Sequence, residues 1–304
     1  MQPDNPITIV IPVYNREATV ARTLGSIDAQ TVAPAAIVLV DNGSADASLS
    51  ILQQWASTRP GVTVAVEPRP GACAARNRGL AMVRTPFVMF FDSDDVMLPR
   101  HVEDFTRAIT EHPGVDIFGR DIMAENADGS RRRNYFSARW PMFSHLFRAS
   151  LGTARMVART ELVRRVGGWD ENLLGWDDFE LGVRMLLTSP RLHDLGGKPT
   201  VLTYATPGSL TGRSFTAHPE RWEPSLEAIR RDMERTGRHD LLKWVDGVSM
   251  ILAAQYAREG SETLSARLYD AVMARTRHPR RMALIYRLFG RLTWPLVRLM
   301  FPFG

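Results

Sequence analysis

The chain has 304 residues, of which 44% are hydrophobic and 23% are charged. This is the composition of an ordinary globular protein, long enough for one large domain and an appendage. A single cysteine, Cys73, excludes a disulfide scaffold within the chain and favours a reducing, cytoplasmic setting. The N-terminus lacks the features of a secretory signal, and no stretch reaches the roughly 18 apolar residues of a membrane span. We therefore expect a chain that does not cross a bilayer.

The net charge of +5 is unevenly distributed along the chain. Residues 271–304 contain seven arginines and no acidic residue, so the rest of the chain is slightly negative. A basic surface spread over a domain is the electrostatic signature of nucleic-acid binding. Because the positive charge is confined to a terminal segment, we expect no nucleic-acid partner.

Short apolar runs alternate with longer amphipathic segments over the first 120 residues. Runs of this kind, apolar on both faces and separated by single helices, predict a parallel sheet covered on both sides. The predicted strands are 7–12, 36–40, 62–67, 87–91 and 115–119, and the predicted helices are 18–30, 44–58, 71–83 and 99–112. The first 120 residues therefore resemble one half of a Rossmann-like domain.

The alternation ends after Gly119. The polar stretch 120–139 contains the turn pair Asp128-Gly129 and predicts a hairpin or loop. A further strand is predicted at 155–158, with helices at 159–166 and 177–187. Beyond Pro219 the pattern is helical, and the predicted helices are 224–236, 239–258 and 261–275.

Polar residues follow three of the predicted strands, at 12–17, 41–46 and 92–95. Ligands of open parallel sheets bind at the carboxyl ends of the strands, so these segments are the candidate site. Neither a G-x-G-x-x-G turn nor a G-x-x-x-x-G-K-[ST] loop is present, which excludes typical dinucleotide enzymes and P-loop NTPases. Taken alone, 41–46 is better explained as a turn and helix N-cap.

The segment Asp92-Ser93-Asp94-Asp95 places three carboxylates directly after an apolar strand. Like charges held this close repel one another unless a proton or a cation neutralises them. Mg²⁺ or Mn²⁺, bound by one or two carboxylates and by substrate phosphates, is the natural partner. The alternative is a solvated helix cap before Pro99.

Several segments in order resemble the family 2 glycosyltransferases, which have a GT-A fold and act with inversion. They are Ile9-Val10-Ile11-Pro12-Val13-Tyr14-Asn15, Val40-Asp41-Asn42-Gly43-Ser44, Ala75-Arg76-Asn77-Arg78-Gly79 and Phe90-Phe91-Asp92-Ser93-Asp94-Asp95. The resemblance continues through Gly167-Gly168-Trp169-Asp170-Glu171 and Gly175-Trp176-Asp177-Asp178, and it covers roughly residues 6–215. It implies an α/β fold of the GT-A type with a mostly parallel central sheet and a C-terminal helical extension.

The resemblance also implies a donor, a cofactor and their residues. The donor is a nucleotide-diphosphate sugar, with uridine the commonest base, and the cofactor is a divalent cation, Mn²⁺ or Mg²⁺. Asp41 would accept a hydrogen bond from the base, Asp92 would face the ribose and Asp94 would hold the metal on the diphosphate. The implied donor-site residues are Pro12, Tyr14, Glu17, Asp41, Arg76, Asp92, Ser93 and Asp94.

The same resemblance places the general base for the acceptor hydroxyl at Asp178, with Trp176 and Asp177 as acceptor-side candidates. A carboxylate within hydrogen-bond reach can take the proton of an attacking hydroxyl. The alternative is that acidic residues gather at a helix N-terminus because they interact favourably with the helix dipole. Trp176 fits core packing about as well as sugar stacking.

The chain departs from the family pattern at Pro207, where many relatives carry a metal-binding histidine; His218 is a possible substitute. Two other functions stay open. One is a nucleotide-sugar-binding protein without transferase activity. The other is a haloacid-dehalogenase-like phosphatase, whose nucleophile loop Asp92-x-Asp94 also matches.

The last segment predicts a peripheral membrane contact. Arg280, Arg287, Arg291 and Arg298 share one predicted helical face, and the residues between them, which include Leu284, Ile285, Leu288 and Phe289, form an apolar surface over 280–301. This pattern suits contact with an anionic membrane and a saccharide or lipid-linked acceptor. The alternative is that this face packs on the protein, and Pro295 interrupts any helix. The predicted organisation is a GT-A domain at 1–218, divided at 120/121 into nucleotide and acceptor halves, a helical extension at 219–275 and a basic tail at 276–304.

Overall fold

The computed structural model describes residues 5–126, 128–204 and 214–291. The chain divides into two compact units, each with its own hydrophobic core. The first unit comprises Met1–Pro141, Ser150–Asn172 and Ser189–Pro207, and the second comprises Met142–Ala149, Leu173–Thr188 and Gly208–Gly304. Within the described ranges, no helix is long and apolar enough to cross a membrane.

A seven-stranded sheet forms the centre of the described part of the first unit, in the order β10-β6-β9-β4-β1-β2-β3. Only β9 runs antiparallel to its neighbours, so the predicted α/β class with a mostly parallel sheet is confirmed. The strands are β1 (Ile7–Val13), β2 (Ala36–Asp41), β3 (Val62–Val66), β4 (Phe87–Phe90), β6 (Ile117–Gly119), β9 (Met156–Arg159) and β10 (Leu192–Asp194).

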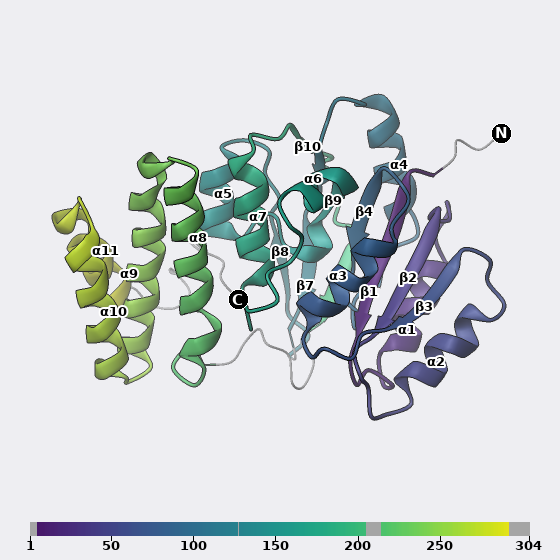
Figure 1. Cartoon of the computed structure of the whole chain (residues 1–304), viewed down its shortest axis with the longest axis horizontal. Coiled ribbons are helices and arrows are strands. Elements are labelled where there is room, and N and C mark those ends of the chain that lie inside the picture. Colours follow the sequence, from purple (N-terminus) through teal and green to yellow (C-terminus); the bar gives the residue numbers. More distant parts are fainter. Residues whose placement is uncertain (1–4, 127, 205–213, 292–304) are drawn as a thin grey trace. The chain divides into compact units, whose positions relative to one another are not determined.

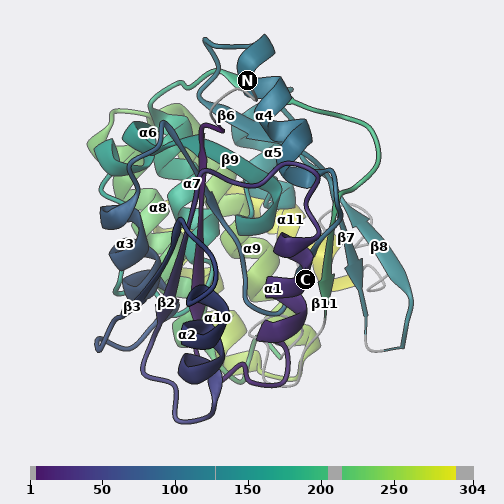
Figure 2. The same cartoon turned by 90° about the vertical axis from the view of Figure 1, so that its right-hand side faces the viewer.

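Helices cover both faces of this sheet, as apolar residues on both faces of each strand require. Ile9 and Ile11 belong to a cluster with α1, α2 and α4, whereas Val10 points toward α3. Gly79 of α3 lies so close to Val10 that a Cβ there would come within 2.3 Å of Val10 Cγ1. Figure 2 shows α3 and α6 on one side of the strands and α1, α2 and α4 on the other. The helices are α1 (Val20–Asp28), α2 (Ser48–Ala56), α3 (Ala72–Met82), α4 (His101–Glu111) and α6 (Thr160–Arg165), and a short 3₁₀ helix, η1 (Thr153–Arg155), precedes β9.

A second, smaller sheet of order β5-β11-β7-β8 lies in the same unit. Its strands are β5 (Val96–Met97), β7 (Ile122–Glu125), β8 (Arg131–Asn134) and β11 (Val201–Tyr204). β7 and β8 form an antiparallel hairpin, as predicted for 120–139. β5 pairs with β11, so the residues immediately after the acidic segment 92–95 are held by a strand from much later in the chain.

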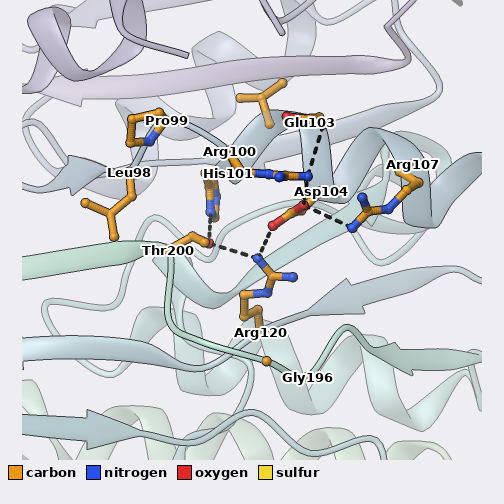
Figure 3. Close-up of polar contacts among 12 residues, drawn as sticks. Leu98, Pro99, Arg100, His101, Glu103, Asp104, Arg107, Arg120, Gly196 and Thr200 are labelled. Atoms are coloured by element: carbon orange, nitrogen blue, oxygen red, sulfur yellow. Dashed lines mark hydrogen bonds and ion pairs between the residues drawn. The ribbon is translucent and has the colours of Figure 1, made fainter. Parts of the chain in front are cut away.

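A buried polar network links α4, the end of β6 and the residue preceding β11 (Figure 3). Arg120 Nη1 donates to Asp104 Oδ2 at 2.6 Å, and both side chains are about nine-tenths buried. His101 Nδ1 lies 2.8 Å from the Thr200 hydroxyl. Burial lowers the pKa of His101 to about 3, with a smaller contribution from the Arg120 charge, so the imidazole is neutral at pH 7.

The second unit is helical (Figure 1), and 11 of the 17 residues of α9 are buried. Helices α8, α10 and α11 all contact α9. The helices are α5 (Pro141–Arg148), α7 (Asp177–Leu187), α8 (Glu223–Arg235), α9 (Leu242–Arg258), α10 (Glu262–Arg275) and α11 (Pro279–Arg291), with 3₁₀ turns η2 (Pro219–Arg221) and η3 (His239–Leu241).

Helix α11 contains the described part of the predicted membrane segment. Met282 and Phe289 are buried in the second core, and Ile285 packs against it. Ile285 and Phe289 therefore do not belong to an exposed apolar face, which corrects the prediction for these two residues. Leu284 and Leu288, in contrast, are 56% and 49% exposed. Residues 292–304 lie outside the described part of the chain.

Candidate functional site

The parallel pairing of β2, β1 and β4 brings the predicted donor-site segments to one edge of the large sheet. Val13 is in register with Asp41, and β4 ends two residues before Asp92. Pro12 and Ser93 are buried in this edge, and the Tyr14 side chain is 57% exposed above it. The structure thus brings the residues predicted from three separate strand ends together.

Asp41 is a buried carboxylate with one oxygen that no described residue satisfies. The residue is 1% exposed. Its Oδ2 accepts the backbone N–H groups of Gly43 and Ser44, each at 3.1 Å. Oδ1 is buried without a hydrogen-bond partner among the described residues. Buried acceptors are nearly always hydrogen-bonded, so an unsatisfied oxygen here suits a donor group supplied by a ligand.

The loop after β1 is held against the loop after β2 by reciprocal hydrogen bonds. The Asn15 N–H donates to the Ser44 hydroxyl at 3.0 Å, and Asn15 Oδ1 accepts the Ala45 N–H at 2.8 Å. Asn15 has φ of 51°, a left-handed conformation that asparagine tolerates better than most residues. The Glu17 carboxylate accepts the Ala47 N–H at 2.9 Å. The Glu17 carboxylate thus helps to hold the loops after β1 and β2 together.

Asn42 connects the end of β2 to the loop that follows β3, a role that the sequence did not reveal. Its Nδ2 donates to the carbonyls of Glu67 and Arg69 at 2.9 and 2.7 Å, and its Oδ1 accepts the Gly71 N–H at 2.8 Å. Arg69 in turn pairs with Glu67 and with Glu171. No local pattern could have identified Asn42, because its partners lie 25 to 29 residues away.

Arg76, predicted to lie near the donor, pairs with Asp92 across the edge. Its Nη2 is 2.9 Å from Asp92 Oδ1, and its guanidinium lies 4.4 Å from the ring centroid of Trp169. Trp169 is fixed by Asn77, whose side chain accepts the Trp169 N–H at 2.8 Å and donates to its carbonyl at 2.9 Å. Asn77 also donates to Glu171. The Gly-Gly-Trp-Asp-Glu segment is therefore anchored on α3.

The acidic segment is as crowded as the sequence predicted. Asp94 Oδ2 lies 3.5 Å from Arg16 Nε. Asp95 is 5% exposed and accepts the Tyr204 N–H at 3.2 Å. Burial raises the pKa of Asp95 well above its usual value, and the charges of Asp92 and Asp94 raise it further. Negative charge is thus concentrated at the carboxyl end of β4.

These carboxylates fit a hard divalent cation, although the described residues do not form a complete protein cage for it. Among them, no three His, Cys, Asp or Glu side chains come together as a metal-binding cluster. Pro207 lies outside the described residues, and His218 Nδ1 pairs with Glu220 at 3.0 Å. Magnesium commonly uses one or two carboxylates and takes its other ligands from substrate phosphates and water, so the carboxylates of this segment are chemically suited to it without a complete protein cage.

The remaining predicted site residues, Trp176, Asp177 and Asp178, belong to the second unit. Asp177 and Asp178 open α7 and are half-buried, so they also occupy the helix N-terminus that acidic residues prefer. Trp176 precedes them with φ of 51° and ψ of 28°. Its ring packs edge-on against Phe179 and lies 5.3 Å from the ring of Trp222.

Known proteins resemble the chain in sequence and in fold. The glycosyltransferase GlyA of Streptococcus pneumoniae serotype 4 is 36% identical over 126 residues, which is 41% of this chain and 18% of GlyA. The chain thus spans less than a fifth of that relative. The structure of S. aureus TarS residues 1–349 with UDP-GlcNAc superposes with a TM-score of 0.67 at 18% identity, covering 93% of this chain and 90% of that one.

A second similar structure is the mannosyltransferase PcManGT of Pyrobaculum calidifontis, in complex with GDP-Man and Mn²⁺. It has a TM-score of 0.59 at 18% identity, and the alignment covers 98% of this chain and 83% of that one. At such identities the two structures show the fold alone, and that fold is the predicted GT-A type. The model of the family described as glycosyl transferase family 2 matches residues 8–165, just over half of the chain, and the chain therefore belongs to the family 2 glycosyltransferases.

Proposed function

We propose that the chain transfers a sugar from a UDP-sugar to an acceptor hydroxyl. The observation that carries this proposal is the buried, unsatisfied Oδ1 of Asp41 at the edge where the three strand ends meet. A carboxylate in this position requires a hydrogen-bond donor. The ring N–H of uracil supplies one, as do those of thymine and guanine, whereas the corresponding nitrogen of cytosine is an acceptor. The UDP-GlcNAc bound in the TarS structure is consistent with a uridine donor.

Asp94 is the residue that we propose holds a divalent cation on the donor diphosphate. Such a cation, when bound, stabilises the negative charge that the leaving nucleotide gathers as the sugar departs. Arg76 Nη2 lies 2.9 Å from Asp92 Oδ1 and so restrains the Asp92 carboxylate. Asp92 is the residue that we propose faces the ribose. Mn²⁺ in the PcManGT complex supports the choice of metal.

Asp178 is the general base in this proposal, and Trp176 and Asp177 line the acceptor side. Asp178 takes the proton of the acceptor hydroxyl as it attacks, and a single in-line displacement then inverts the anomeric configuration. If Asp177→Asn is the crippling change and Asp178→Asn is mild, the base is Asp177 instead.

A contact with an anionic membrane is a further part of the proposal, now limited to the outer face of α11. Leu284 and Leu288 are exposed one turn apart, and Arg280, Arg281 and Arg287 on the same helix are exposed as well. Exposed leucines flanked by arginines suit the interface between headgroups and acyl chains. A lipid-linked or other saccharide acceptor would be consistent with this location.

Ligand-induced stabilisation tests the donor proposal. Melting temperatures are measured with UDP-, GDP-, dTDP- and CDP-sugars, with and without Mn²⁺, since a ligand that binds only the folded state raises its stability. UDP-sugars should stabilise the wild type, and Asp41→Asn should abolish the effect. Stabilisation by CDP-sugars as large as by UDP-sugars would contradict the role of Asp41. Donor binding without any slow release of UDP would favour the alternative of a binding protein that lacks transferase activity.

A further inference from the structure

The segment Gly175-Trp176-Asp177-Asp178 is supported by α8, a helix that lies outside the family match at 8–165. The support comes from the first turn of α8, within the second unit. Ser225 Oγ donates to the Gly175 carbonyl at 2.6 Å, and Ser225 is fully buried. This hydroxyl therefore connects two segments that are 50 residues apart in sequence.

The backbone at this point is strained. Trp176 adopts a left-handed conformation, which costs a bulky side chain of order 1 kcal/mol or more. Such a conformation persists only where the surroundings enforce it. A hydrogen bond to the carbonyl just before Trp176 fixes the peptide that leads into the strained residue, so Ser225 is well placed to enforce it.

Packing around Gly175 and Trp176 also stabilises the left-handed conformation of Trp176. A Cβ at Gly175 would lie 3.0 Å from the Arg221 carbonyl oxygen and 3.3 Å from the Trp222 ring, so only glycine fits without displacement. The Trp176 ring lies 5.3 Å from Trp222 and 6.2 Å from Phe215. The turn is thus enclosed by the segment that leads into α8.

A side chain of α5 fixes the backbone in the first turn of α7. His145 is fully buried, and its Nε2 donates to the Phe179 carbonyl at 2.8 Å. Gly182 permits this approach, because a Cβ there would come within 2.2 Å of His145 Nε2. Asp177 and Asp178 therefore lie between two backbone positions, Gly175 and Phe179, that are each fixed by a buried side chain.

We propose that Ser225 is a positioning residue for the transfer reaction, acting through the Gly175–Trp176 turn on the direction of the Asp178 carboxylate. This inference rests on the proposed role of Asp178 as the base. It makes α8 a part of the catalytic apparatus rather than a separate appendage. A small displacement of a catalytic group can cost a large factor in rate, since the reacting atoms must be aligned.

The test compares Ser225→Ala with Ser249→Ala. Ser249 is also fully buried in the second unit, and its hydroxyl donates to the Val245 carbonyl of its own helix at 3.0 Å. Both changes delete one buried hydrogen bond, but only the first touches the turn. Turnover is followed as release of the nucleoside diphosphate, with Mn²⁺ and water as the acceptor: UDP from UDP-GlcNAc or UDP-Glc, and GDP from GDP-Man.

Ser225→Ala should lower kcat by about 10- to 100-fold and leave the donor KM unchanged, whereas Ser249→Ala should leave both unchanged. Ser225→Cys, with its weaker donor, should fall between Ser225→Ala and the wild type. In an Asp178→Asn background Ser225→Ala should have no additional effect, because residues that act through one another are not additive.

Hydrogen exchange gives a readout that does not depend on activity. The Glu180 N–H donates to the Trp176 carbonyl at 3.0 Å, so its exchange reports on the turn itself. Ser225→Ala should accelerate it by about tenfold, the factor equivalent to about 1.4 kcal/mol, and Ser249→Ala should not. Equal exchange in the two variants would refute the proposal.

The kinetic outcomes separate this inference from the proposed function. If Asp178→Asn cripples turnover while Ser225→Ala behaves like Ser249→Ala, the base assignment stands and the positioning role is overturned. If Asp178→Asn retains full turnover, the base assignment itself fails. A loss caused by Ser225→Ala that persists undiminished in the Asp178→Asn background would show that Ser225 does not act through Asp178, and would overturn the positioning role.

Discussion

Replacing Asn42 by aspartate should destabilise the candidate donor edge although the side chain keeps its size. The amide group donates two buried hydrogen bonds, at 2.9 and 2.7 Å, to the carbonyls of Glu67 and Arg69. A carboxylate would instead place a hydrogen-bond acceptor next to the carbonyl oxygens of Glu67 and Arg69, which are acceptors themselves. Two lost hydrogen bonds and the unpaired groups left behind predict a loss of about 2 to 4 kcal/mol, or a fall in Tm of about 5 to 10 °C for a unit of this size.

The defect of Asn42→Asp should depend on pH. Only the protonated carboxyl group can donate to a carbonyl, so the pKa of the new side chain is raised above its unfolded value of about 3.9. The folded state then binds the proton more tightly than the unfolded state. The stability that this single O–H contributes, by donating to one of the two carbonyls, is therefore fully present below about pH 3.9 and is lost as the pH rises through the raised pKa of the folded state.

Thermal unfolding by circular dichroism between about pH 4.5 and 8, a range that lies above the unfolded pKa of about 3.9, together with UDP binding by calorimetry, measures both effects. Asn126→Asp is the matched control, because Asn126 is exposed and its side chain donates a single hydrogen bond, to the Ser130 hydroxyl. The cost of this change should stay within about 0.5 kcal/mol. A Tm at the alkaline end equal to that of the wild type, or a defect that grows on acidification, would refute the reasoning about Asn42.

The metal, the base, the outer face of α11 and the buried histidine can each be tested separately. Asp94→Ala should abolish the Mn²⁺-dependent part of UDP affinity measured by calorimetry, and unchanged affinity with Mn²⁺ would remove the metal assignment. Asp178→Asn should keep donor binding and cut turnover by about 10²- to 10⁴-fold, with NMR of the wild-type product showing an inverted anomeric centre; a retained configuration would contradict the mechanism. Changing Leu284 and Leu288 together to serine should reduce sedimentation with anionic but not neutral liposomes while Tm is preserved, and undiminished binding would show that this face is not the contact. His101 is held neutral with a pKa of about 3. Its contribution to stability is therefore present above about pH 6.5 and falls by about 1.4 kcal/mol per pH unit below that. His101→Gln should make the acid side of the Tm-against-pH profile less steep, and an unchanged slope would contradict this account.

The packing of α11 changes how the C-terminal segment should be tested. Truncation after His278 would remove Met282 and Phe289, which are buried in the second core. Such a truncation is expected to expose the apolar surface of α9, so a loss of solubility would not report on membrane binding. Substitutions at the exposed positions of α11 avoid this ambiguity.

The central sheet was predictable because its signal is local. Runs such as Ile7–Val13 are apolar at nearly every position, and only a strand covered on both faces buries all of them. The hairpin at 120–139 followed from its Asp-Gly turn, and α7 followed from its helical periodicity. The donor-edge residues could be grouped from the sequence alone, because parallel strands end at a common edge.

Other features depended on contacts that no local pattern encodes. The strand β5 has only two residues and exists through its pairing with β11, more than a hundred positions later. Helix α5 and strand β10 were missed for the same reason, since each is short and is stabilised by packing rather than by its own sequence. The inward orientation of Phe289 was likewise decided by α9, because periodicity shows that a helix has an apolar face but not what covers it.

The sequence by itself determined the fold class, the family and the order of the segments that we propose bind the donor, because hydrophobic periodicity and short polar motifs are properties of neighbouring residues. The tertiary structure alone decided which oxygen of Asp41 is left without a partner among the described residues, how Asn42 fixes the loop after β3 and that Ser225 reaches the Gly175 carbonyl. The contacts of Asn42 and Ser225 join residues that are tens of positions apart. Their energies arise only when the completed fold removes the groups from water and brings them within hydrogen-bond distance.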